Sequence, residues 1–161
     1  MVNWPFKVIQ GGATVNPPTV KAKAVSLLAQ REYSRQELSD KLKAEDASPE
    51  EVEQALAQLA AKGLVDDARV VETLVNRRSS KLGASRLRQE LQAKGVSADM
   101  VAETMADLKG TELARARGVW EKKFGLLASS ASERNKQARF LASRGFSGDV
   151  VRQVVSGLSE D

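Results

Sequence analysis

The chain has 161 residues, of which 42% are hydrophobic, 4% aromatic and 29% charged. Its abundant Ala, Leu, Glu, Lys and Arg are good helix formers, so the composition predicts an all-α fold. The sequence contains no Cys and no His, which excludes disulfides, zinc sites built on these residues and nucleophiles activated by His. It also lacks the GxxxxGK[ST] and GxGxxG phosphate-binding loops. We predict no catalytic residue, no metal site and no cofactor.

The net charge of the chain is +4, a mild excess that favours a polyanionic partner. No stretch reaches the roughly 18 apolar residues of a membrane span, and the N-terminus lacks the pattern of a secretory signal. We therefore expect a soluble, cytoplasmic monomer that does not bind membranes.

Residues 1–19 are expected to form a flexible tail. They include several residues that interrupt regular structure, namely Pro5, Gly11, Gly12, Asn16, Pro17 and Pro18. The alternative is that the apolar residues of this segment pack on the body of the protein, and these are Trp4, Phe6, Val8 and Ile9.

The helical period begins after the tail and predicts three short helices. The first helix is expected over Val20 to Gln30. Ser34 with Glu37 has the form of a capping box at the start of the second helix, and Ser48 before Pro49 predicts the start of the third. Apolar residues recur at helical spacing in all three, at Ala24, Leu27, Leu28, Leu38, Leu42, Val52, Leu56 and Leu59.

This three-helix unit occurs three times. A shift of 49 positions lays Leu87, Leu91, Ser97, Val101, Met105 and Leu108 over Leu38, Leu42, Ser48, Val52, Leu56 and Leu59. A further shift of 50 positions adds Leu141, Ser147, Val151, Val155 and Leu158. We predict three tandem three-helix repeats over 20–63, 64–110 and 111–161, each with its own core, in an elongated and curved array. Helical solenoids of other families have a similar repeat length, so the repeat length alone does not identify a family.

A glycine separates the last two helices in the second and third units, within KGVSAD and RGFSGD. The first unit has EDASPE at this point, so we expect its second helix to end differently. Gly63 is expected to end the third helix of the first unit. The leading helices of the other two units, over 66–79 and 111–124, align less cleanly with the first.

Basic residues concentrate in two acid-free runs. The first run, between Val75 and Gln89, contains Arg77, Arg78, Lys81, Arg86 and Arg88. The second, from Arg134 to Gly148, contains Lys136, Arg139 and Arg144, with Lys122 and Lys123 before it. Such runs favour a patch that neutralises phosphates or acidic side chains. For Arg77 and Arg78, the alternative is that they only complement the C-terminus of a helix.

Two further features have a functional and a structural interpretation. Phe140 and Phe146, within the second run, could stack on bases of single-stranded nucleic acid, but their spacing favours core positions. Asp66 and Asp67 are adjacent, and neighbouring helical side chains point about 100° apart, which suits one metal ion poorly. We expect one aspartate to cap the following helix and the other to favour its positive end.

An ordered series of motifs runs through nearly everything after the tail. It begins with Ala24-x-x-Leu27-Leu28-x-x-Arg31-Glu32-x-Ser34-Arg35-x-Glu37-Leu38-x-x-Lys41-Leu42, which resembles the opening of the RecX family. Its central signature resembles Gly63-Leu64-Val65-Asp66-Asp67-x-Arg69 and Gly83-x-x-Arg86-Leu87-Arg88-Gln89-Glu90-Leu91-x-x-Lys94-Gly95. Its third repeat resembles Lys122-Lys123-Phe124-Gly125 and Arg139-Phe140-Leu141-x-x-Arg144-Gly145-Phe146. The chain departs from the family at Val70-Val71, where Phe and Ala are usual.

The resemblance implies a small cytoplasmic regulator that binds the RecA–DNA filament in its helical groove. Such proteins inhibit ATP hydrolysis, strand exchange and coprotease activity of RecA, and so act in recombination, DNA repair and the SOS response. Together with the charge runs, it suggests a contact surface made of Arg77, Arg78, Lys81, Arg86, Arg88, Lys94, Lys122, Lys123, Arg139 and Arg144. Two alternatives are a module that binds single- or double-stranded DNA directly, with RecA contact secondary, and a purely structural scaffold.

Overall fold

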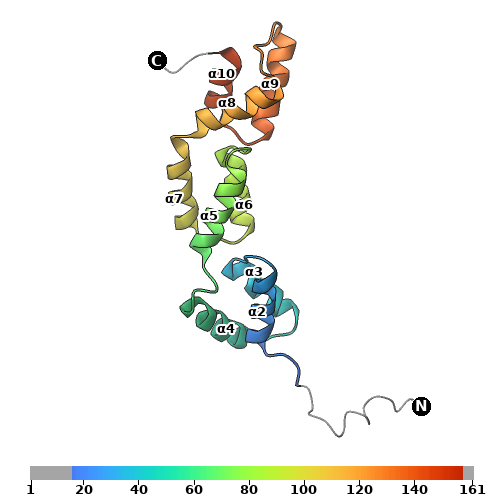
Figure 1. The fold of residues 1–161 in the computed structure, drawn as a ribbon, viewed down its shortest axis with the longest axis vertical. Coiled ribbons are helices and arrows are strands. Elements are labelled where there is room, and N and C mark those ends of the chain that lie inside the picture. The colour runs from blue at the N-terminus through green and yellow to red at the C-terminus, as the bar shows by residue number, and fades with distance from the viewer. Residues whose placement is uncertain (1–15, 158–161) are drawn as a thin grey trace, which may run out of the picture.

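The computed structural model describes residues 16–157, which form nine α-helices and no strand. The helices group in threes into an elongated array (Figure 1), as predicted. Repeat 1 contains α2 (Val20–Gln30), α3 (Arg35–Ala44) and α4 (Pro49–Ala61); repeat 2 contains α5 (Asp67–Arg78), α6 (Ala84–Ala93) and α7 (Ala98–Lys109); repeat 3 contains α8 (Glu112–Lys123), α9 (Ala131–Ser143) and α10 (Gly148–Ser156). None of these helices is long and apolar enough to cross a membrane. Most of the predicted tail lies outside the described residues.

The helix starts follow the predicted caps. The Ser34 hydroxyl accepts a hydrogen bond from the Glu37 amide at 3.1 Å, and the Glu37 side chain accepts one from the Ser34 amide, which completes the capping box. Ser48 caps α4 with Pro49 as the first helical residue. Ser97 and Ser147 cap α7 and α10 in the same way. A serine before each third helix therefore satisfies an amide that would otherwise have no partner.

Each repeat has a separate hydrophobic core, as the periodicity predicted. The second helices supply fully buried leucines, namely Leu38, Leu42, Leu87, Leu91 and Leu141. The third helices add Val52, Leu56, Leu59, Val101, Leu108, Val151 and Val155, while Met105 is partly buried. Leu158 lies outside the described residues. All the extensive helix–helix packing is within repeats, so the repeats depend on other contacts to hold their relative positions.

The end of the second helix is the same in all three repeats, which corrects the expectation for repeat 1. Gly95 and Gly145 have positive φ after α6 and α9, and the amides that follow them bond back to Leu91 and Leu141. Asp46 takes this position after α3 with φ 65, and the Ala47 amide bonds back to the Leu42 carbonyl at 3.4 Å. The reason is that aspartate tolerates the left-handed conformation better than most residues.

Successive repeats meet where the start of one second helix contacts the end of the next. At the junction of repeats 1 and 2, the Ser34 hydroxyl donates to the Lys94 carbonyl. At the junction of repeats 2 and 3, the Gly83 amide donates to the Arg144 carbonyl at 2.8 Å, and the Ser85 amide to Gly145 at 3.2 Å. Ser34 and Gly83 are both N-caps, and Lys94 and Arg144 are both C-caps. The two junctions are therefore built on equivalent positions.

A carboxylate strengthens each junction. Asp67, the first residue of α5, accepts from the Arg35 amide at 2.8 Å. Glu112, the first residue of α8, is buried and accepts from the Ala84 amide at 3.4 Å and the Ser147 amide at 3.3 Å. Arg35 and Ala84 are each the first residue of a second helix. Each carboxylate thus lies between two or more helix N-termini, whose partial positive charge it balances.

We predict that Gly83→Ala destabilises the protein, because an added Cβ would lie 2.3 Å from the backbone carbon and oxygen of Gly145. Relieving this overlap requires a shift of the backbone, so the free energy of unfolding should fall by about 1–3 kcal/mol, as measured by urea denaturation. Gly118→Ala is the matched control, since nothing lies within 4 Å of a Cβ there. It should stabilise α8 by about 0.5–1 kcal/mol. Equal stabilities for the two variants would contradict the tight contact at this junction.

Candidate functional site

The candidate site is the set of ten basic residues predicted from the charge runs and the family resemblance. Nine of their side chains are exposed and the tenth, Lys94, is half-buried. Arg77, Arg78 and Lys94 line a groove between repeats 1 and 2, and Arg88 lines a cleft between α6 and α7. In repeat 3, Lys123 and Arg144 lie over an aromatic ring.

The groove between repeats 1 and 2, the junction groove, has a volume of about 590 Å³. It brings Arg77, Arg78 and Lys94 together, and it adds Arg31, which the sequence prediction did not include. The other lining residues are Glu32, Val70, Thr73, Leu74 and Glu90. Its cations therefore face carboxylates of the same groove.

Most of the junction-groove cations are engaged within the protein. Arg78 binds Glu90 through two hydrogen bonds, of 3.2 and 2.5 Å. Arg31 and Lys94 both approach Glu37, at 3.0 and 3.5 Å. Arg77 makes no side-chain hydrogen bond or ion pair within residues 16–157. Arg77 is consequently the groove cation most available to an external anion.

Glu37 links the two sides of this junction. Burial raises the pKa of its carboxyl, but the Ser34 amide, Arg31 and Lys94 together outweigh burial and hold the pKa below its usual value. A neighbouring pair joins Arg69 to Glu32, at 2.6 Å, and hydrogen bonding to Glu32 raises the pKa of Arg69. The junction of repeats 1 and 2 is thus held partly by charges.

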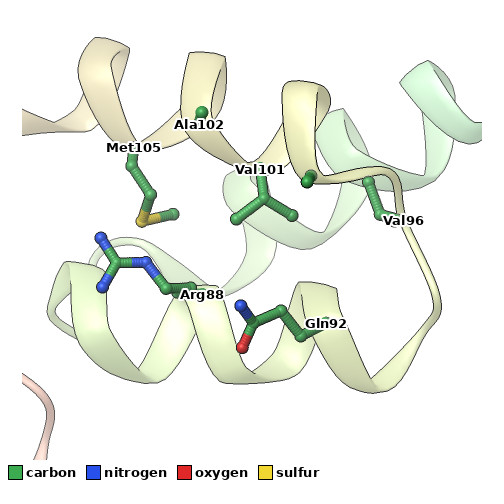
Figure 2. Close-up of a pocket in the computed structure, with 7 residues that line it drawn as sticks. Arg88, Gln92, Val96, Val101, Ala102 and Met105 are labelled. Atoms are coloured by element: carbon green, nitrogen blue, oxygen red, sulfur yellow. The ribbon is translucent and has the colours of Figure 1, made fainter.

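Arg88 lies apart from the junction groove. It lines a cleft of about 520 Å³ between α6 and α7, where Arg88 and Gln92 reach toward Met105 and Val101 (Figure 2). It also lines a second cleft, of about 520 Å³, between repeats 2 and 3, together with Lys109. Arg88 has no hydrogen-bond or ion-pair partner in the part of the chain that the structure describes. Its guanidinium is free at the edge of two adjoining clefts.

Two arginines support the junction of repeats 2 and 3. Arg86 donates to the Ser143 carbonyl at 3.1 Å, at the end of α9. Arg115, which the sequence prediction missed, donates to the carbonyls of Ser79 at 2.9 Å and Leu82 at 2.6 Å, and burial lowers its pKa. Neither contact has a local sequence signal, because each joins residues more than 30 positions apart. Arg86 therefore positions repeat 3 as well as carrying charge.

In repeat 3 two of the predicted cations lie over an aromatic side chain. Lys123 and Arg144 lie over the Phe140 ring, at 5.3 and 4.9 Å from its centre, and Phe124 packs edge-on against that ring at 5.5 Å. Phe140 is half-buried and packs on the core, whereas Phe146 is buried in it. The prediction that these phenylalanines occupy core positions is thus confirmed for Phe146. Phe140 contacts the core and also has two cations over its ring.

The remaining predicted residues are exposed and unengaged. Lys81, Lys122 and Arg139 make no side-chain hydrogen bond or ion pair among the residues described.

Of the adjacent aspartates Asp66 and Asp67, one was expected to cap the following helix. Asp66 does so, because its side chain accepts hydrogen bonds from the amides of Ala68 and Arg69 at the start of α5. The described residues contain no group of three or more acidic side chains placed to hold a metal ion. The arrangement is therefore suited to binding anions.

Comparison with known proteins gives the family. Models of the first, second and third three-helix domains of RecX match residues 21–59, 66–105 and 111–155. The chain belongs to the RecX family. The regulatory protein RecX of Leptothrix cholodnii is 45% identical over 137 residues, which cover 85% of this chain and 87% of that protein. The RecX of Chromobacterium violaceum is 41% identical over 143 residues, covering 89% and 93%.

The fold is also that of a RecX crystal structure. The RecX of Lactobacillus salivarius superposes with a TM-score of 0.72 at 22% identity, over 86% of this chain and 94% of that one. The three matched RecX domains fall on repeats 1, 2 and 3, one on each. The family resemblance noted in the sequence is confirmed.

The lowered pKa of Glu37 predicts how stability depends on pH. Because its pKa is lower in the folded chain than in the unfolded one, its contribution is present above the unfolded value and is lost as the pH falls through the folded value. Glu37→Gln should lower the free energy of unfolding at neutral pH by about 1–2 kcal/mol and by less near pH 3, as followed by urea denaturation.

Glu45→Gln is the control for this experiment. Glu45 forms an exposed pair with Lys23 at 3.7 Å, and such pairs contribute little. A Glu37→Gln penalty that is the same at acid and neutral pH would contradict the role given to the carboxylate charge.

Proposed function

We propose that the chain is a regulator of the RecA recombinase that binds the RecA–DNA filament in its helical groove. Bound there, it inhibits ATP hydrolysis, strand exchange and coprotease activity. Membership of the RecX family, whose named relatives are regulatory proteins, supports a regulatory role. The proposal also makes the protein a cytoplasmic monomer without enzymatic activity of its own.

The observation that carries this proposal is the distribution of unengaged cations along an elongated array. Arg77, Lys81 and Arg88 lie on repeat 2, and Lys122 and Arg139 on repeat 3, none with an ion pair in the described part of the chain. A filament with a helical groove offers phosphates and acidic side chains along its length. Cations spread over two repeats match such a partner better than a compact anion.

The predicted residues then divide by role. We assign direct contact to Arg77, Lys81, Arg88, Lys122 and Arg139. The other five residues also make contacts within the protein. Arg78 and Lys94 do so at the junction groove. Arg86 does so at the junction of repeats 2 and 3, and Lys123 and Arg144 over the Phe140 ring. In this assignment the second group keeps the repeats and Phe140 in place, and its charge extends the surface.

The second candidate function is direct binding to single- or double-stranded DNA. The cations over Phe140 favour it, because an aromatic ring beside basic residues suits a nucleic-acid strand. Its signature is tight binding to naked DNA with a steep dependence on salt concentration. Filament-specific regulation requires instead that the filament bind more tightly than naked DNA under the same conditions.

We predict that Arg77→Ala, Lys81→Ala and Arg88→Ala, combined in one variant, relieve inhibition of DNA-dependent ATP hydrolysis by RecA. The concentration for half-inhibition should rise roughly tenfold or more, because three external contacts are lost without an internal one. The helical circular dichroism should remain that of the wild type, since none of the three side chains has a partner in the described chain.

The matched control removes three charges from repeat 1, by Lys41→Ala, Lys43→Ala and Lys62→Ala. These residues are exposed and lie outside the proposed surface, so the control should inhibit almost as the wild type does. Equal inhibition by the repeat 2 variant and the wild type would reject the contact assignment. A wild-type protein that leaves ATP hydrolysis unaffected would reject the proposed function.

A further inference from the structure

The connection between α8 and α9 displays the most exposed large hydrophobic side chains that the structure describes. Leu126 is 78% exposed and Leu127 is 57% exposed. The next are Leu64 at 45% and Val25 at 43%, both in or next to repeat 1. Leu127 rests on the end of α10, since a Cβ at Gly157 would lie 3.0 Å from its methyl carbon. Leu126, the more exposed of the two leucines, is called the apolar tip.

The backbone around this tip is held in place from both sides. The buried side chain of Gln137 donates to the Leu126 carbonyl at 3.1 Å and accepts from the Trp120 indole at 2.9 Å. On the other side, Glu133 accepts from the amide and the hydroxyl of Ser129, both at 3.0 Å. A loop whose backbone is already ordered loses little further conformational freedom when a partner binds to it. The tip is consequently suited to act as a binding anchor.

The sequence on either side of the tip is mostly basic. Between Lys122 and Arg144 the sequence has six basic residues and a single acidic one, Glu133. Glu133 accepts hydrogen bonds from Ser129, as described above. Phe140 follows Gln137 by three residues on α9, and Lys123 and Arg144 lie over its ring. An apolar centre with a charged rim is the usual anatomy of a protein–protein contact.

We propose that Leu126 is an anchor that inserts into an apolar pocket with an acidic rim on a protein partner. This inference rests on the proposed function, in which that pocket belongs to the RecA subunits of the filament. The anchor would add an apolar contact with protein to a contact surface that otherwise consists of basic side chains. A leucine side chain forms no hydrogen bond or ion pair with phosphate, so the anchor distinguishes the protein component of the filament from its DNA.

The test compares Leu126→Ser with Leu126→Met in the full chain. Binding is measured by fluorescence anisotropy to RecA filaments on single-stranded DNA with a non-hydrolysable ATP analogue, and to the same DNA without RecA. Leu126→Ser should lose roughly tenfold or more in filament affinity, because a buried leucine side chain is lost from the contact. Its affinity for naked DNA should remain that of the wild type, and Leu126→Met should retain filament binding.

Leu64→Ser is the matched control, since it removes an exposed leucine from the end of repeat 1 and should not affect filament binding. Wild-type affinity of Leu126→Ser for the filament would overturn the anchor and leave the proposed function in place. Equal losses for filament and naked DNA would also overturn it, in favour of a DNA contact. A wild-type protein that does not bind the filament would overturn the proposed function itself.

Discussion

The contact between the start of one second helix and the end of the next is the constraint on which the rest of the structure depends. Each repeat completes its own hydrophobic core, so little apolar surface is left to hold the repeats together. Polar groups at helix ends do this instead: the N-termini of α3 and α6 meet the C-terminal turns of α6 and α9. Opposite ends of helix dipoles attract, so α3, α6 and α9 follow one another head to tail.

The two junctions are equivalent in position but differ in chemistry. Repeats 1 and 2 are joined through side chains, with Ser34, Asp67 and the Glu37–Lys94 pair. Repeats 2 and 3 are joined through backbone amides and carbonyls near Gly83, where glycine lets the two segments approach closely. Side chains also join them, those of Arg86, Glu112 and Arg115. The first junction therefore depends on side-chain groups, whereas the second also requires the close backbone approach at Gly83. Of the unengaged basic side chains, Arg77 lines the groove at the first junction and Arg88 lines a cleft at the second.

Sequence reasoning predicted what local rules determine. Ser34, Ser48, Ser97 and Ser147 begin helices because a serine hydroxyl satisfies a terminal amide, and the repeated leucines are buried because their spacing matches one helix face. It failed at Asp46, where a residue other than glycine takes the left-handed conformation. It also missed Arg115, whose hydrogen bonds to the carbonyls of Ser79 and Leu82 join two repeats. Which cations are engaged depends on contacts across the junctions, which no local pattern reports.

The central claim is that helix-end contacts fix the three repeats in a single arrangement. Because the chain has no Cys, Lys43→Cys in α3 and Lys136→Cys in α9 can carry spin labels at exposed positions on repeats 1 and 3. Pulsed electron paramagnetic resonance then measures the distance between the labels across both junctions. A single arrangement of the repeats predicts one narrow distance distribution, no broader than label flexibility explains. A broad or multimodal distribution would show repeats that move independently and would contradict it.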